Sequence, residues 1–245
     1  MSVFVERWDA LWRYLREYHQ YEVIGGEHVP AVGPALVAST HSLATYENLM
    51  LASLSCDELG RRPFIVGDDL MFKVPWLGAR LREARMIPRD RQAAVDLLRA
   101  GEIVGLGPGG MREALRPSHD RYRFDWHGRL GFVWVSIVAQ APIIVGVCPT
   151  ADDIYTVYEN PITPWLYKQF KLPMPLFRGR GLSPLPRPVK IVHWISAPIA
   201  PPAVAPDDVT DEIVAAHHAL VSERMHALVS EALAQASDTR SSNAE

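Results

Sequence analysis

The sequence is poor in the features that mark several classes of protein. It has two cysteines in 245 residues, Cys56 and Cys148, which are too few for a disulfide scaffold or a multi-cysteine zinc site. We expect both to be reduced thiols in the core of a cytoplasmic protein, and we expect no metal site. The formal net charge of −3 and the lack of a basic arm argue against nucleic-acid binding.

Long apolar runs are also scarce. The first residues lack the apolar centre of a signal peptide, because Glu6 and Arg7 come early. The most hydrophobic stretch, residues 131–147, is 17 residues long and contains Gln140 and Pro142. A membrane span needs about 20 apolar residues, so this stretch predicts a buried helix that runs into a buried strand. We therefore expect a chain that does not span a membrane.

The residues that are present predict one folded domain. A hydrophobic fraction of 48% and a charged fraction of 22% are ordinary for a globular chain. Short apolar runs alternate with helical patterns, which is typical of an α/β fold with a mixed, mostly parallel sheet flanked by helices. The strand candidates are 22–24, 35–39, 64–66, 86–88, 103–106, 142–147 and 189–195.

The two ends of the chain are expected to differ from this α/β body. Residues 1–20 predict an amphipathic helix, because aromatic and leucine side chains recur there at steps of three and four. Residues 21–235 would form the α/β domain and close with a helix over 207–235, and residues 236–245 would be a disordered tail.

Two segments carry surfaces suited to lipid. The N-terminal helix either covers the core or lies on a membrane surface through Trp8 and Trp12. Residues 164–188 mix aromatic, leucine and methionine side chains with basic residues and contain no acid. This segment is either an irregular connection over the core or a contact with an anionic membrane, which would involve residues 164–180.

A histidine and an acid follow the buried strand candidate 35–39. His41 lies just past this strand, at the edge where open α/β sheets place their sites. Glu47 lies six residues further on, so a bend at the start of the next helix would bring its carboxylate back to the ring. A carboxylate that holds one imidazole nitrogen leaves the other free to accept a proton from a hydroxyl.

A glycine-rich turn follows the strand candidate 103–106. Its residues 105–110 formally fit G-x-G-x-x-G, but Pro108 lies within the turn and Pro117 soon breaks the next segment, which disfavours a dinucleotide site. The alternative is a tight turn whose N–H groups face a substrate, with Arg112 and Glu113 beside it.

Basic residues outnumber acids in residues 61–99, by nine to five. Arg89 lies in this region. The excess indicates either solvated helix faces or a seat for a polyanionic group such as the phosphates of coenzyme A.

Together these segments resemble a known family. The order ALVASTH, FKVPWLGARLREARMIPRDR, GLGPGGMREAL and WHGRLGFVWVSIVAQAPIIVGV is similar to the lysophospholipid acyltransferase-like superfamily. It is closest to the branch of diacylglycerol-acyltransferase-like and related neutral-lipid-forming enzymes, in which the third block reads P-G-G-x-x-E-A. The resemblance implies transfer of a fatty acyl group from acyl-CoA or an acyl-carrier protein to a lipid alcohol. It further implies action at a membrane surface, without a metal or redox cofactor.

The resemblance also implies roles for residues. His41 would be the general base and Glu47 its orienting partner, as catalytic residues. The substrate-binding residues would be Arg89 and Arg112 for phosphates, Gly109 and Gly110 for the oxyanion, and Glu113.

The sequence departs from the family pattern at two places. Tyr46 occupies the position of the usual acid, with Glu47 one residue later, and Gly109 replaces a glutamate of the phospholipid-making members. The second departure favours a less charged acceptor. A non-catalytic lipid-binding member and a lipid esterase stay open as alternatives, and the sequence predicts no oligomeric state.

Overall fold

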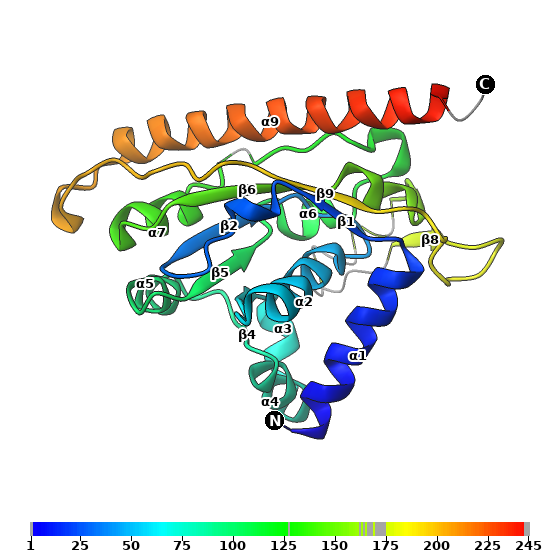
Figure 1. Cartoon of the computed structure of the whole chain (residues 1–245), viewed down its shortest axis with the longest axis horizontal. Coiled ribbons are helices and arrows are strands. Elements are labelled where there is room, and N and C mark those ends of the chain that lie inside the picture. Colours follow the sequence, from blue (N-terminus) through cyan, green and yellow to red (C-terminus); the bar gives the residue numbers. More distant parts are fainter. Residues whose placement is uncertain are drawn as a thin grey trace.

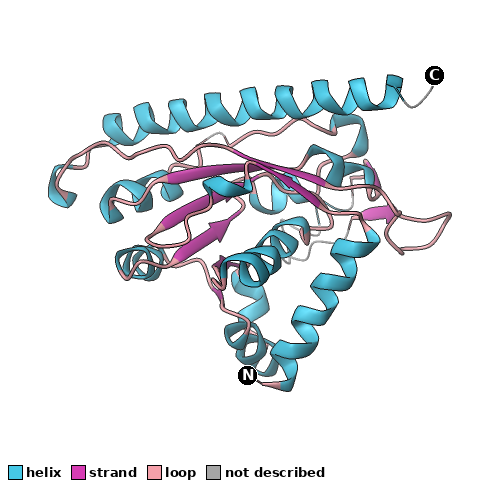
Figure 2. Ribbon diagram, viewed as in Figure 1, coloured by secondary structure: helices cyan, strands magenta, loops and turns pink. Residues whose placement is uncertain are grey.

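A seven-stranded mixed sheet organises the molecule (Figures 1 and 2). The computed structural model describes residues 2–126, 128–161, 163, 165, 169 and 175–242. The strand order is β1-β9-β6-β2-β5-β3-β4, and every neighbouring pair is parallel except β6 and β9. The predicted fold class is thereby confirmed. The strands are β1 (Glu22–Ile24), β2 (Ala35–Ser39), β3 (Phe64–Val66), β4 (Met86–Ile87), β5 (Ile103–Leu106), β6 (Ile143–Val147) and β9 (Val192–Ile195).

Helices cover both faces of this sheet. One face packs against α5 (Arg91–Arg99), α7 (Gly131–Ala139) and α9 (Asp211–Ser242), and the other against α1 (Val3–Tyr18) and α2 (Glu47–Leu59). Figure 1 shows the two layers, with α9 above the sheet and α2 below it. Other helices in the described part of the chain are α3 (Asp69–Phe72), α4 (Pro75–Glu83) and α6 (Gly110–Ala114), together with 3₁₀ turns at Gly26–His28, Ser118–Asp120, Pro149–Asp153 and Pro206–Asp208.

The central strand β2 explains why both faces need covering. All five of its residues are buried. Successive side chains of a strand point to opposite faces, so Leu36 and Ala38 join the core under α5, α7 and α9, whereas Ala35 and Val37 join the core on the α2 side. This apolar run folds stably because both faces of β2 are removed from water.

The N-terminal amphipathic helix is present as α1, and its aromatic stripe faces the protein. Trp12 is 7% exposed and Trp8 is half-buried, with their ring centroids 5.1 Å apart. Trp12 in turn lies 6.4 Å from the ring of Tyr46 beside α2. The expectation that Trp8 and Trp12 contact a membrane is therefore corrected, since both pack onto the core.

Two features of the C-terminal half differ from the sequence-based expectation. Helix α9 begins at Asp211 and continues to Ser242, so it includes residues 236–242, for which a disordered tail is predicted. Residues 243–245 lie outside the described part. The segment 164–180 contains the unpredicted strand β8 (Leu176–Arg178), which pairs with β7 (Thr156–Tyr158) in a second, two-stranded sheet. Within that segment, residues 164, 166–168 and 170–174 lie outside the described residues.

In the part of the chain that the structure covers, no helix is both long enough and apolar enough to cross a bilayer.

A buried ion pair docks α1 onto the body of the protein. Arg62 donates to the Asp9 carboxylate through both terminal nitrogens, at 2.7 and 2.5 Å, and Asp9 is only 6% exposed. We expect Asp9→Ala to lower the free energy of unfolding by about 1.5–3 kcal/mol, because a charged hydrogen bond is lost and Arg62 is left without its partner. Urea unfolding measures this change. The control is Glu6→Ala on the exposed side of the same helix, and equal losses for the two variants would contradict the assignment.

Candidate active site

His41 lies immediately beyond the carboxyl end of β2. Its ring Nδ1 is 3.1 Å from the backbone oxygen of Ser42. A carbonyl oxygen can only accept, so Nδ1 carries a proton at this contact, and in the neutral imidazole Nε2 is then the nitrogen with a free lone pair. His41 is half-buried and lines a cavity. It therefore presents a nitrogen able to accept a proton in a space that a ligand can reach.

Two buried carboxyl groups hold the backbone at this point. The His41 N–H donates to Glu113 Oε1 at 2.5 Å, and the Ser42 N–H donates to Glu47 Oε1 at 2.7 Å. Glu47 begins α2 and Glu113 lies in α6, so side chains from two helices accept hydrogen bonds from two consecutive N–H groups. This arrangement fixes where the His41 ring can point.

Glu47 contacts the site differently from the sequence-based expectation. Its second oxygen accepts from the Ser42 hydroxyl at 2.9 Å, so its hydrogen bonds go to Ser42 and not to the imidazole. Glu47 is 1% exposed, and this burial raises the pKa of its carboxyl, while the nearby His41 ring and the Ser42 donors lower it. Glu47 thus affects His41 by holding the neighbouring Ser42 backbone and by its electrostatic interaction with the ring, and it makes no direct hydrogen bond to the imidazole.

Glu113 lies behind His41 and not in the cavity. It is 5% exposed, and its Oε2 has no hydrogen-bond partner among the described residues. Burial raises the pKa of Glu113 to about 8, against the opposing effects of Arg116 and of the His41 N–H. The predicted substrate-binding role is corrected by this position, because the carboxyl contacts the protein backbone.

The glycines of residues 105–110 have separate functions in the structure. A Cβ on Gly107 would lie 2.4 Å from His41 Cδ2, and one on Gly109 would lie 2.0 Å from Glu113 Oε2. Side chains at either position would displace the groups that form the site. Gly110 has a φ of +55°, and its N–H donates to the Gly107 carbonyl at 3.1 Å. The Gly110 N–H is therefore engaged within the turn, which corrects its predicted role as an oxyanion donor.

The two predicted phosphate-binding arginines are on the surface. Arg89 is 57% exposed and lies 3.4 Å from Asp68 and 3.4 Å from Asp69, so a phosphate would have to displace these carboxylates. Arg112 is exposed next to Met111, which lines the cavity, although Arg112 itself does not. Neither guanidinium contacts His41.

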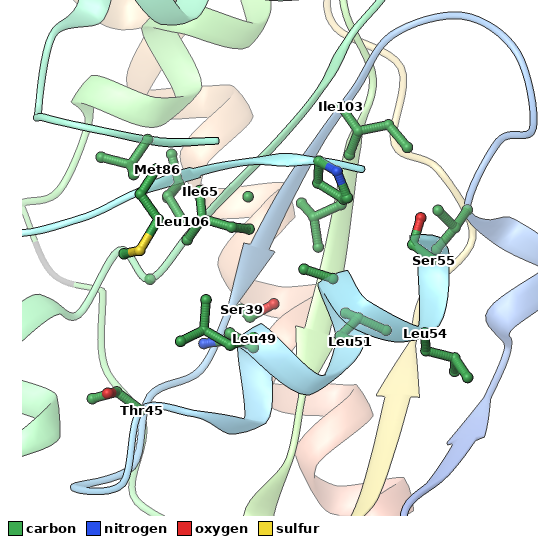
Figure 3. Close-up of a pocket in the computed structure, with 18 of the residues that line it drawn as sticks. Ser39, Thr45, Leu49, Leu51, Leu54, Ser55, Ile65, Met86, Ile103 and Leu106 are labelled. Carbon is green, nitrogen blue, oxygen red and sulfur yellow. The ribbon is translucent and has the colours of Figure 1, made fainter. Parts of the chain in front are cut away.

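An apolar cavity of about 500 Å³ separates α2 from the sheet. Figure 3 shows Leu49 and Leu51 of α2 on one side of the cavity and Ile65, Met86 and Ile103 of the strands on the other. His41 and Gly107 line one end. Ile103 lies four residues before Gly107 in the chain, which is about 13 Å at the rise of a strand. The lining is suited to an apolar ligand, and His41 borders the space that this ligand would fill.

Sequence reasoning missed several residues that shape this site. Gly105 and Gly107 alternate along β5 and its extension, so both turn toward the cavity and leave it open. Ser42 links Glu47 to the histidine loop, and Asn48 lines the cavity while it donates to the Thr40 carbonyl at 3.2 Å. The alternation of the two glycines was visible in the sequence, whereas the contacts of Ser42 and Asn48 depend on how α2 meets β2.

Among the described residues, no group of three or more His, Cys, Asp or Glu side chains is placed to hold a metal ion.

Comparison with known proteins identifies the family. Residues 20–148 match the family model described as Acyltransferase, which covers more than half of the chain. The match includes β2, His41, Glu47, the glycine turn and β6.

Several curated relatives share a single description. The chain is 28% identical over 219 residues to "DGAT1/2-independent enzyme synthesizing storage lipids" of Bos taurus and equally to that of Homo sapiens. It is 29% identical over 224 residues to that of Gallus gallus. These alignments cover 88–91% of this chain but only 62–64% of the relatives, so the chain spans less than two thirds of their length.

A solved structure shares the fold. The 1-acyl-sn-glycerophosphate acyltransferase PlsC of Thermotoga maritima superposes with a TM-score of 0.56. The superposition covers 91% of this chain and 79% of that one, at 14% sequence identity. The sheet and its helices are therefore those of the PlsC fold.

The raised pKa of Glu113 makes the stability of the site depend on pH. The folded carboxyl stays protonated up to about pH 8, whereas an unfolded one ionises near its ordinary value of 4.5. The protonated Glu113 therefore makes its full contribution to the free energy of unfolding below pH 4.5. This contribution is lost as the pH rises from 4.5 toward 8. Glu113→Gln keeps the acceptor for the His41 N–H but cannot titrate. We expect the variant to gain stability relative to the wild type between about pH 5 and about pH 8.

Urea unfolding of both proteins at the two pH values measures this difference. The matched control is Glu6→Gln at an exposed site, which should change both stabilities equally. A stability difference between Glu113→Gln and the wild type that does not vary with pH would show that the carboxyl is ionised in the folded protein.

Proposed function

Because the chain belongs to the Acyltransferase family, we propose that it transfers a fatty acyl group from an acyl thioester to a lipid alcohol. The observation that carries the proposal is the position of His41 at one end of an apolar cavity, with Nδ1 engaged by the Ser42 carbonyl and Nε2 left as the nitrogen available to a substrate. The cavity accommodates the acyl chain, so the thioester carbonyl would lie at the His41 end. A general base beside that carbonyl is what acyl transfer to a hydroxyl needs.

The steps follow from this placement. An acceptor hydroxyl donates its proton to His41 Nε2 as its oxygen attacks the thioester carbon. The tetrahedral intermediate collapses, the carbon–sulfur bond breaks, and the imidazolium returns the proton to the leaving thiolate. The ester and the free thiol are the products, and no acyl-enzyme forms. Each proton passes through His41, so the proposed reaction uses no metal or redox cofactor.

The two buried carboxyls would support His41 in different ways. Glu113 fixes the backbone N–H of His41, and Glu47 fixes the next one, so the ring approaches the substrate in one orientation. The charge of Glu47 would also stabilise the imidazolium that forms during the reaction. We therefore assign both as positioning residues.

The donor and the acceptor are assigned from chemistry. Arg89 and Arg112 lie exposed beyond the ends of the strands and would attract the phosphates of coenzyme A or of a carrier-protein prosthetic group. The relatives' description names storage lipids, which supports a glycerolipid acceptor with little charge. Such alcohols reside in membranes, so we propose that the protein works at a membrane surface, on the cytoplasmic side.

His41→Ala tests the proposal. We expect acyl transfer to fall by about 100-fold or more, because a positioned general base typically contributes 10²–10⁴. Folding should be kept, since the ring is only half-buried at the edge of a cavity. The control is His119→Ala at an exposed site. The assay follows labelled acyl-CoA with a panel of lipid alcohols.

The products separate the alternatives. Ester that depends on His41 supports the acyltransferase, free acid alone indicates an esterase, and binding of the acyl chain without turnover indicates a lipid-binding protein. Full ester formation by folded His41→Ala protein would refute the mechanism.

A further inference from the structure

An exposed apolar surface spans the end of α3 and the start of α4. Trp76 is 72% exposed, and Leu70, Met71 and Val74 are each 37–38% exposed. Single apolar side chains are ordinary on protein surfaces, but four within seven consecutive residues form a patch. We call this patch, residues 70–76, the α3–α4 surface. It lies at the bottom of the molecule in Figure 1, next to the N-terminal end of α1.

The α3–α4 surface is rigidly supported. Phe72 is half-buried beneath it, with the Arg82 guanidinium 5.3 Å from its ring centroid. Asp68 accepts from the Leu70 N–H at 2.9 Å and begins α3. These contacts stabilise the start of α3 and the position of Phe72, so the exposed apolar side chains project from two short helices.

The charges around this surface are mostly basic. Residues 70–82 contain Lys73, Arg80 and Arg82 and no acid, and all three cations are exposed. The acids that flank the segment are engaged, because Asp68 and Asp69 pair with Arg89, and Glu83 pairs with Arg80 and accepts from the Ser2 hydroxyl. Arg80 is balanced by Glu83, so Lys73 and Arg82 carry the surplus of positive charge. An apolar patch with a surplus of positive charge is complementary to an anionic lipid surface.

The surface is also continuous with the cavity. Met71 belongs to both, since it is exposed on the outside and lines the cavity within. Gly67 and Asp68, just before α3, line the cavity as well. A hydrocarbon chain that left a bilayer at this surface would therefore meet the cavity at Met71.

We propose that the α3–α4 surface inserts into the interface of an anionic lipid bilayer and places the cavity mouth against the membrane. The second half of this statement rests on the proposed function, in which the cavity takes an acyl chain, whereas insertion itself does not. The occupant is a lipid surface and not a second copy of this chain, because a symmetric pair of copies would bring Lys73 and Arg82 of one copy against the same cations of the other.

A second exposed apolar region offers the comparison. Leu182 is 89% exposed, and Leu176 and Leu185 are also exposed, close to β8. Figure 1 shows β8 at the right of the molecule, away from α4. None of the described residues that line the cavity comes from this region. Binding through Leu182 would leave the cavity away from the lipid.

Flotation with vesicles tests the proposal. Wild-type protein is expected to float with vesicles of phosphatidylcholine plus phosphatidylserine, and to float less with phosphatidylcholine alone. Val74→Glu should weaken flotation by about tenfold or more, because it puts a negative charge among the inserted apolar side chains. Leu182→Glu is the matched control and should float like the wild type. Melting temperatures confirm that both variants are folded.

A spectroscopic readout locates the inserted side chain. Trp76→Phe keeps an aromatic ring, so it should still float, but it should lose most of the blue shift in tryptophan emission that vesicles cause in the wild type. An unchanged emission shift in Trp76→Phe would overturn the assignment.

Other outcomes also overturn the proposal. Loss of flotation in Leu182→Glu but not in Val74→Glu would place the contact at the β8 side. Absence of flotation for the wild type, or conversion of a dimer to a monomer by Val74→Glu in analytical ultracentrifugation, would reject a lipid occupant. Flotation uses no substrate, so the two proposals can fail separately. If the protein does not float but still acylates a detergent-dispersed acceptor, only the membrane proposal is rejected. If the protein floats but acylates no acceptor, only the proposed function is rejected.

Discussion

The two hydrogen bonds that hold the N–H groups of His41 and Ser42 are the constraint on which the rest of the site depends. Each N–H is taken by a buried carboxyl, from Glu113 in α6 and from Glu47 in α2. Burying carboxyl groups is costly, and the raised pKa of both records that cost. The carboxyls also repel each other, which contributes to the raised pKa of Glu113. Protonation of Glu113, which its raised pKa favours at neutral pH, relieves this repulsion.

The same constraint explains the glycines and the cavity. Once His41 is fixed at the end of β2, the neighbouring strand must pass without a side chain at Gly107, and the turn must pass Glu113 without one at Gly109. Gly105 also carries no side chain toward Ile65, so the strand leaves room between the sheet and α2. The glycines that formally fit G-x-G-x-x-G thus leave space open beside His41. The proposed catalytic group and the space for its proposed substrate come from one short stretch of β2 and β5.

The sequence predicted most of the fold because the strands of this sheet are apolar runs bounded by clear breaks. Residues 35–39 are buried on both faces, and a continuous apolar run is what such a strand requires. The site was predicted only in part. His41 and Glu47 could be named from their positions in the sequence. That Glu47 bonds to Ser42 and not to the imidazole depends on the angle between β2 and α2, which no local sequence pattern predicts. The burial of Trp12 and the exposure of Trp76 could not be predicted either, because both tryptophans lie in segments of similar composition. Trp12 is buried only because α1 packs against α2. Helix α9 exceeded its predicted length because polar residues near a C-terminus indicate disorder by composition alone.

The central claim is that an acyl chain lies in the cavity below α2 with its reacting carbonyl at His41. A crystal structure with an acyl-CoA analogue, in which a methylene group replaces the thioester sulfur, tests it most directly. The account predicts hydrocarbon density between Leu51 and Ile103, a carbonyl group beside His41 and Gly107, and the coenzyme outside near the ends of the strands. A chain bound elsewhere on the protein, or one that enters with its carbonyl at the Ile103 end, would contradict the account.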